Sequence, residues 1–195
     1  MISGQSLQLK SDRLTNLLAG RIYGQQLTIT TPSLSNAGKI VGVNNAQVAI
    51  NVSGAIQNSG LIGGQSLQLK GDRLDNLLTG RIYGQQLTIT THSLSNAGEI
   101  VGVNNAQVAI NVSPSLDNAG EIVGVNNAQV AINVSGAIQN SGLIGGQSIQ
   151  LNGDTLDNLL AGRIYGNQVT MSARSLRNAG EIVGVNAGQT AIHVS

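Results

Sequence analysis

Apolar and polar residues alternate in short segments along the whole chain. Residues 47–52 (QVAINV), 26–30 (QLTIT) and 66–70 (SLQLK) show the two-residue period of strands with one buried face. Val, Ile and Thr dominate these segments, and clusters of Asn and Gly separate them, which is typical of strands joined by turns. The pattern therefore predicts many short strands.

One segment, residues 13–22, also fits a helix, because Leu14, Leu17, Leu18 and Ile22 would share a helical face. Asn and Gly interrupt that face, and the matching segments elsewhere shorten to Asn-Ala-Gly or Asn-Ser-Gly. We therefore predict a strand, a turn lengthened by two residues, and a second strand.

A unit of about 20 residues recurs along the chain. Each unit starts with Leu or Ile two residues before an Asn, passes a short turn, and reaches an Ile flanked by Gly two residues to either side. Spacings between units are 18, 20 or 22 residues. Residues 98–113 recur unchanged as 120–135, and the pattern continues afterwards. A fold that accepts a whole extra unit is built by stacking equivalent layers, as in a solenoid. The nine unit starts are Leu14, Leu34, Ile56, Leu74, Leu94, Leu116, Ile138, Leu156 and Leu176.

Strand-like periodicity in a solenoid predicts an all-β fold, a parallel β-helix of about nine coils with three short strands and three turns per coil. The leucine-rich-repeat spacing and the calcium-binding glycine repeat are both absent from the sequence. Inward ladders are expected from the Leu or Ile before Asn, the central Ile, and pairs such as Val48 with Ile50. The repeated Asn should pair with turn backbone or with the Asn one coil away. We expect one repeat domain over residues 1–195, a segment of a longer solenoid.

Composition narrows the classes of function. Apolar residues make up 41% of the chain, enough for a core, whereas charged residues are 10% and the formal net charge is +1. The absence of Cys excludes disulfides, thiolate nucleophiles and Cys-ligated metals. Without a basic face we expect no nucleic-acid partner, and without a long apolar run we expect no membrane span. Residues 1–4 (MISG) show no export signal.

The string L-x-N-x-x-x-G-R-I-Y-G, at residues 14–24, 74–84 and 156–166, resembles the repeats of filamentous haemagglutinin. A shorter form, L-x-N-A-G-x-I-V-G, is similar to the same repeats. They occur in exoproteins of two-partner secretion systems, which include adhesins and contact-dependent inhibition proteins. The resemblance implies a right-handed parallel β-helix, export through an outer-membrane transporter, a secreted or cell-surface location, and a role in adhesion or display.

Carboxylates are the first candidates for chemistry, because some β-helices cleave polysaccharides with carboxylate clusters. Two pairs lie three residues apart, Asp72 with Asp75 and Asp154 with Asp157. In the first unit Thr15 replaces the second Asp, so we interpret these positions as solvated turns. His92 aligns with Pro32 and Arg174, and His193 aligns with Asn at an outward strand position, so we expect both histidines to face solvent. We predict no catalytic residues, no cofactor-binding residues, no metal ligands and no enzyme activity.

Three outward features are interpreted as surface. The residue before each central Ile forms what we call the charged column: Arg21, Lys39, Leu61, Arg81, Glu99, Glu121, Leu143, Arg163 and Glu181. Arg81 with Glu99 and Arg163 with Glu181 should pair between coils. The outward tyrosines, Tyr23, Tyr83 and Tyr165, recur too rarely to stack as a sugar-binding platform. Outward Thr pairs such as Thr28 with Thr30 skip coils, which disfavours ice binding.

The leading hypothesis is a segment of a secreted adhesive or display filament that contacts glycans or receptors on host or bacterial cells. The alternative is the passive delivery stalk of a contact-dependent growth inhibition toxin. A polysaccharide-acting β-helix enzyme is the remote alternative. We also expect end-to-end self-association, because an open last coil presents unpaired strand edges.

Overall fold

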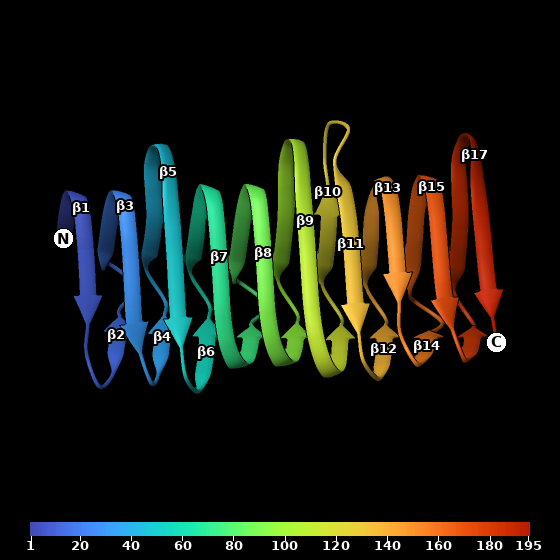
Figure 1. Ribbon diagram of the computed structural model, residues 1–195, viewed down its shortest axis with the longest axis horizontal. Coiled ribbons are helices and arrows are strands. Elements are labelled where there is room, and N and C mark those ends of the chain that lie inside the picture. The colour runs from blue at the N-terminus through green and yellow to red at the C-terminus, as the bar shows by residue number, and fades with distance from the viewer.

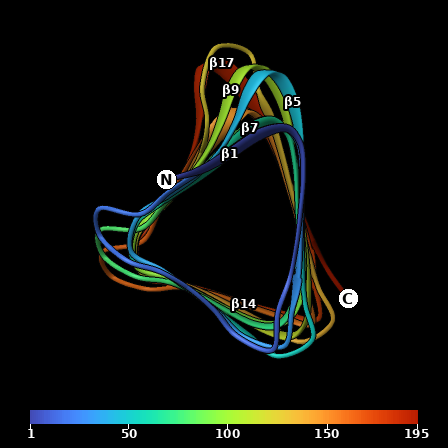
Figure 2. The same ribbon diagram turned by 90° about the vertical axis from the view of Figure 1, so that its left-hand side faces the viewer.

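The computed structural model describes residues 1–195, except for the side chain of Ala187. Strands wind into an elongated solenoid of about ten turns with roughly 20 residues per turn, and no helix occurs among the described residues. Figure 1 shows the coils stacked along the long axis, and Figure 2 shows their triangular outline. Seen from the N-terminal end, the chain winds clockwise as it recedes, so the β-helix is right-handed (Figures 1 and 2).

The described strands form one sheet, and each pairs in parallel with strands of the neighbouring coils. The strands are β1 (Ile2–Lys10), β2 (Leu14–Asn16), β3 (Arg21–Thr31), β4 (Leu34–Asn36), β5 (Lys39–Val52), β6 (Ala55–Asn58), β7 (Leu61–Asn76), β8 (Arg81–Asn96), β9 (Glu99–Asn118), β10 (Glu121–Gly124), β11 (Gln129–Val134), β12 (Ala137–Asn140), β13 (Leu143–Asn152), β14 (Thr155–Asn158), β15 (Arg163–Ala173), β16 (Ser175–Asn178) and β17 (Glu181–Val194).

The solenoid has one more partial coil than the nine that the sequence pattern predicts. β1 pairs with β3 from Ile2 opposite Ile22 to Lys10 opposite Thr30. Ile2 and Gly4 are therefore the end of an Ile-x-Gly unit that precedes Leu14. The pattern missed this coil because its Leu-x-Asn strand is not in the chain, although its other two sides are.

Each coil has three sides, as predicted, but the strands are longer than expected. In the first complete coil, β2 forms one side and β3 bends across the other two, with a corner between Gly24 and Gln26. Four coils lengthen this corner, and in β5 the extra residues include Asn44 and Asn45 with φ of 55° and 57°. Asn tolerates this left-handed backbone better than most residues, which explains its presence there.

Inward ladders of like residues fill the interior. The central Ile side chains from Ile22 to Ile164 are 0–2% exposed, and the Leu or Ile side chains from Leu34 to Leu156 are equally buried. Val48 and Ile50 point inward together, as predicted. Stacked aliphatic side chains of one shape pack closely, so this core is filled although the chain has no Phe or Trp.

The first Gly of each unit marks a close approach between coils. A Cβ atom on Gly120 would overlap the carbonyl oxygen of Gly98 and the backbone of Ala97. Ala119 and Gly120 both donate backbone hydrogen bonds to Asn96 in the coil before. A side chain here would push the coils apart, which accounts for the unbroken Gly at this turn.

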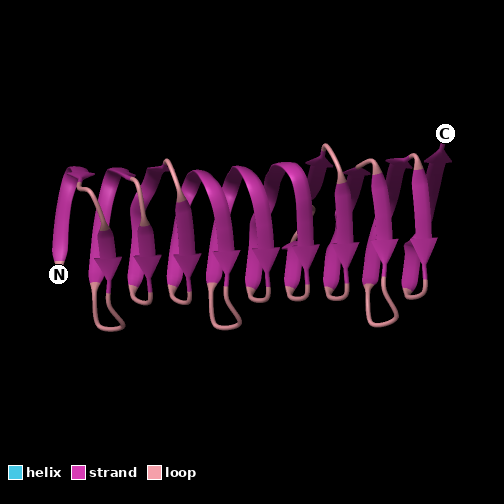
Figure 3. Cartoon of the chain, turned by 90° about the horizontal axis from the view of Figure 1, so that it is seen from below, coloured by secondary structure: helices cyan, strands magenta, loops and turns pink.

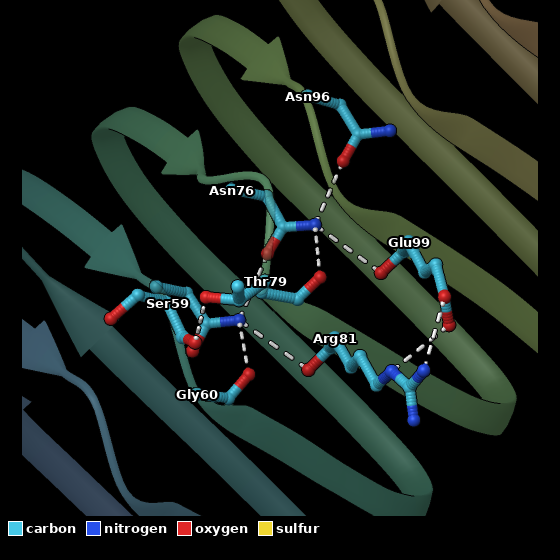
Figure 4. Close-up of polar contacts among 9 residues, drawn as sticks. Ser59, Gly60, Asn76, Thr79, Arg81, Asn96 and Glu99 are labelled. Atoms are coloured by element: carbon cyan, nitrogen blue, oxygen red, sulfur yellow. Dashed lines mark hydrogen bonds and ion pairs between the residues drawn. The ribbon is translucent and has the colours of Figure 1, made fainter. Parts of the chain in front are cut away.

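The repeated Asn residues form a continuous ladder, as predicted, and all of its members except Asn178 are buried. Each Nδ2 donates to Oδ1 of the Asn in the next coil over 2.7–2.9 Å. Asn76 Nδ2 also donates to the carbonyl oxygens of Gly80 and Glu99, both at 3.2 Å (Figure 4). The ladder ties the turn of one coil to the strands of the next. Its members are Asn16, Asn36, Asn58, Asn76, Asn96, Asn118, Asn140, Asn158 and Asn178.

Candidate functional site

A groove follows one corner of the solenoid parallel to its axis. Two elongated hollows of about 750 and 820 Å³ lie along it, and Lys70 lines both. The outward residue near the end of each third side belongs to the lining, as at Thr30, Asn51, Asn111 and Asn152. We call this feature the long groove.

Polar side chains within the long groove bond to each other from coil to coil. Asn133 Nδ2 donates to Asn111 Oδ1 at 3.1 Å, and Asn152 Nδ2 donates to Asn133 Oδ1 at 2.8 Å. Ser135 Oγ donates to Ser113 Oγ at 2.7 Å. These groups repeat with the coil spacing of about 4.8 Å. The groove therefore offers a row of amide and hydroxyl groups beside the charged side chains of Lys10, Asp12, Lys70 and Asp154.

The two carboxylates of the first predicted pair, Asp72 and Asp75, contact different side chains. Asp72 is exposed, as expected for a solvated turn, and its Oδ1 lies 3.1 Å from His92 Nδ1. Asp75, in contrast, is only 7% exposed, so its assignment to a solvated turn was wrong. It lies within β7, and its Oδ1 accepts a hydrogen bond from Arg73 Nε at 2.8 Å. The long arginine side chain covers the carboxylate and compensates its burial.

The second carboxylate pair behaves in the same way. Asp154 forms a bidentate ion pair with Arg174, in which Arg174 Nη2 lies 2.6 Å from Asp154 Oδ2. The hydrogen bond from this guanidinium lowers the pKa of Asp154. Asp157 is half-buried on β14, opposite Gln139 and Arg177. In each pair the first carboxylate thus contacts a side chain of the next coil, His92 in one case and Arg174 in the other.

The histidines lie apart from each other. His92 is exposed, as predicted, and its contact with Asp72 went unnoticed in the sequence. The signal was available, because Asp72 and His92 occupy the same position in consecutive coils, as do Asp154 and Arg174. His193 lies on β17 opposite Ser172. Among the described residues, no three His, Asp or Glu side chains gather to hold a metal ion.

The charged column follows one line along the solenoid, and both predicted ion pairs are present. Arg81 Nε lies 3.2 Å from Glu99 Oε2, and Arg163 Nε lies 3.9 Å from Glu181 Oε2. Figure 4 shows the first pair beside the Asn ladder. Glu121 lies directly after Glu99 in this column. Its carboxylate therefore adds to a local negative charge.

The three tyrosines point outward, as predicted, and are half-buried against the neighbouring coils. The ring of Tyr83 lies over Gly63, where any Cβ atom would overlap it. Burial raises the pKa of the Tyr83 phenol. Tyr165 instead donates a hydrogen bond to Glu181. Because Gly63 has no side chain, the Tyr83 ring packs against the backbone there, and this contact holds the ring in place.

Three turns carry exposed leucines that the sequence analysis did not recognise as a surface. Each lengthened turn after an Asn of the ladder has Leu-Leu at its tip, and the second Leu is 81–85% exposed. The predicted turn is confirmed, since Gly20 N donates to Leu17 O at 2.7 Å. Figures 2 and 3 show the three loops projecting from the same corner. We call them the Leu-Leu turns: residues 17–18, 77–78 and 159–160.

Comparison with known proteins gives one informative similarity. No family model matches the chain, and no solved structure matches it. The chain is 30% identical over 190 residues to "Deoxyribonuclease CdiA" from Dickeya dadantii (strain 3937). The match covers 96% of this chain but only 5% of that protein. The structure also contains no helix that is long and apolar enough to cross a membrane, within the residues described. The chain is therefore similar, along nearly all of its length, to a short stretch of a much larger protein.

Proposed function

We propose that the chain is one section of the rigid stalk of a secreted exoprotein of the contact-dependent inhibition type. The observation that carries this proposal is the match to CdiA, which takes in nearly the whole β-helix and one-twentieth of that protein. About ten coils at about 4.8 Å form a rod of roughly 45 Å. Many such sections in series would hold a distal domain far from the cell that displays it.

The interior supports this mechanical role. A stalk must resist bending and must not come apart between coils. Here the Ile ladder and the Asn ladder run through every complete coil, and the Asn side chains cross-link consecutive turns. Each coil is covalently continuous with the next and bonded to it on three sides, so stiffness follows from the repeat itself.

We assign the nuclease activity in the relative's name to sequence outside the matched stretch. Several of the carboxylates already engage neighbouring side chains on the rod surface, as Asp72 does with His92 and Asp154 with Arg174. A passive stalk needs no catalytic group of its own. Its partners are the preceding and following coils and, during export, an outer-membrane transporter.

An exchange of segments tests the proposal. The matched stretch of the Dickeya CdiA is replaced by this chain, by a flexible Gly-Ser linker of equal residue number, or by a version of this chain with Arg81, Glu121 and Lys70 all changed to Ser. The first and third exchanges should preserve contact-dependent inhibition of target cells, because a stalk acts through its length. The linker should abolish it. Loss of inhibition in the third protein alone would contradict a passive role.

The long groove supports a second candidate, an adhesive filament. Its amides and hydroxyls repeat from coil to coil, as the hydroxyls of a linear glycan repeat along the polymer. Binding of the segment to a glycan panel at physiological salt tests this function, with Asn133→Ala as the groove variant. Saturable binding that this substitution weakens would favour adhesion, whereas cleavage of a polysaccharide would favour the enzyme alternative.

A further inference from the structure

The Leu-Leu turns form a row of apolar knobs along one corner of the rod. Leu18, Leu78 and Leu160 are each more than four-fifths exposed. They lie in the coils of Ile22, Ile82 and Ile164, so two coils separate the first knob from the second and three separate the second from the third. Figure 3 shows these loops projecting beyond the other turns on that side. Contiguous exposed apolar surface marks interaction sites, and each of these turns exposes two adjacent leucines.

Between the second and third knobs lies a hollow that could receive such a knob. It has a volume of about 330 Å³, and Leu78 forms one wall. The turns at its floor are Ala97-Gly98 and Ala119-Gly120, which lack the two inserted leucines. Glu99, Glu121 and Leu143 of the charged column border it. Knob and hollow therefore lie on the same surface of one chain.

We infer that this corner binds a second copy of the chain, side by side and antiparallel, with the Leu-Leu turns interdigitated. This inference goes beyond the stalk proposal, because it concerns contact between rods. A parallel pair in register would set each knob against its equivalent. An antiparallel pair with its two-fold axis at the coil of Ile100 instead places Leu78 opposite the coil of Ile122 in the second copy. That coil lies in the hollow between two knobs, and the contact is self-complementary.

The charged column selects this register. With the axis at Ile100, Arg81 faces Glu121 of the second copy, and Arg21 faces Glu181. Leu61 faces Leu143, the two uncharged members of the column. Glu121 lies beside Glu99 within its own chain, so a facing arginine would relieve that repulsion. Opposite charges at matched positions provide register and specificity.

The remaining facing positions are like-charged, but in each facing pair at least one residue is already neutralised within its own chain. Lys39 would face Arg163, which already pairs with Glu181. Glu99 would face its equivalent at the axis, and each Glu99 pairs with Arg81 of its own chain. Shifting one copy by one coil gives a less favourable contact in either direction. In one direction the first knob of each copy meets the third knob of the other, and in the opposite direction Glu99 of each copy meets Glu121 of the other. The interdigitated register is therefore favoured over its neighbours.

Sedimentation equilibrium of the purified chain over a wide concentration range tests the inference. We expect a reversible dimer that Leu78→Ser with Leu160→Ser weakens by about tenfold or more. Val125→Ser is the matched control, because Val125 is exposed at the corner that carries the long Asn loops. It should leave dimerisation unchanged. Circular dichroism and melting temperature check that each variant keeps its fold.

A charge swap distinguishes loss of the contact from loss of the fold, because misfolding in the single variants would not be reversed in the double variant. Arg81→Glu and Glu121→Arg should each weaken the dimer, and the double variant should restore it, because the facing pair is re-formed with its signs exchanged. Glu99 keeps one cationic neighbour in the double variant.

Three results would overturn the inference: a monomer at every concentration, association unaffected by the leucine variants, or a double swap that fails to restore it. Association that the leucine variants leave unaffected would indicate end-to-end stacking of the rods instead. Leucine-dependent binding to phosphatidylcholine–phosphatidylglycerol vesicles by a chain that stays monomeric would show that the knobs serve a lipid surface. Failure of the dimer would leave the segment exchange in CdiA unaffected, so the two proposals are separable.

Discussion

Removing one Asn from the middle of the Asn ladder should destabilise the solenoid far more than removing one from its end. Asn118 is fully buried, and its Nδ2 donates to Asn140 Oδ1 at 2.8 Å and to the carbonyl oxygens of Gly120 and Leu143 at 3.2 Å. Its own Oδ1 accepts from Asn96 Nδ2 at 2.8 Å. Asn118→Ala breaks all four bonds and leaves buried polar atoms unpaired.

The magnitude follows from those contacts. A hydrogen bond contributes about 1 kcal/mol net, and a buried polar atom left without a partner costs about 1–3 kcal/mol. Asn118→Ala should therefore lower the free energy of unfolding by about 3–5 kcal/mol, a large share of a typical domain's stability of about 5–15 kcal/mol. Asn178 is exposed and accepts one bond, from Asn158 at 2.8 Å. Asn178→Ala should cost about 1 kcal/mol or less.

Urea unfolding followed by circular dichroism measures both variants, and hydrogen exchange locates the loss. Stacked repeats can open locally, so the amides of the coils around Asn118 should lose protection before those at the ends. Equal, small effects of the two substitutions would refute the reasoning. The Asn ladder would then be a consequence of the stacking and not a source of its stability.

Three further predictions test the core, the turns and the surface charges. Ile122→Asp should abolish cooperative thermal unfolding, because it buries an unpaired carboxylate in the Ile ladder; a wild-type melting curve would contradict its inward placement. Gly120→Ala should lower the melting temperature strongly, whereas Gly145→Ala should not, since a Cβ on Gly145 has its first contact at 3.6 Å. The carboxyl of Asp154 should titrate below the usual aspartate range by NMR and return to it in Arg174→Gln; the pair's contribution to stability is present at neutral pH and is lost as the pH falls through this lowered pKa.

Much of the fold could be predicted because a solenoid repeats its local rules. The Asn of each unit is identical along the chain, and identical residues in consecutive coils must stack, so the Asn ladder follows from the sequence. The same argument located the ion pair of Arg81 with Glu99. The same argument applies to Asp72 and His92, which occupy one position in consecutive coils, although their contact was not among the predictions.

Other features depended on how each coil bends in three dimensions. Asp75 was interpreted as part of a solvated turn, but the strand continues through it and the side chain of Arg73 covers it. The long groove also has no local signal, since its lining comes from single residues of many coils.

The sequence by itself determined the β-solenoid, the order of its coils and the residues that face inward. These follow from alternation and repetition, which depend on neighbours in the chain and on stacking of equal units. Only the tertiary structure decided that the Leu-Leu turns project along one corner, and that a hollow with a floor of Ala and Gly lies between the second and the third of them. Those relations depend on the rotation and rise from coil to coil, and therefore on backbone packing over the whole rod.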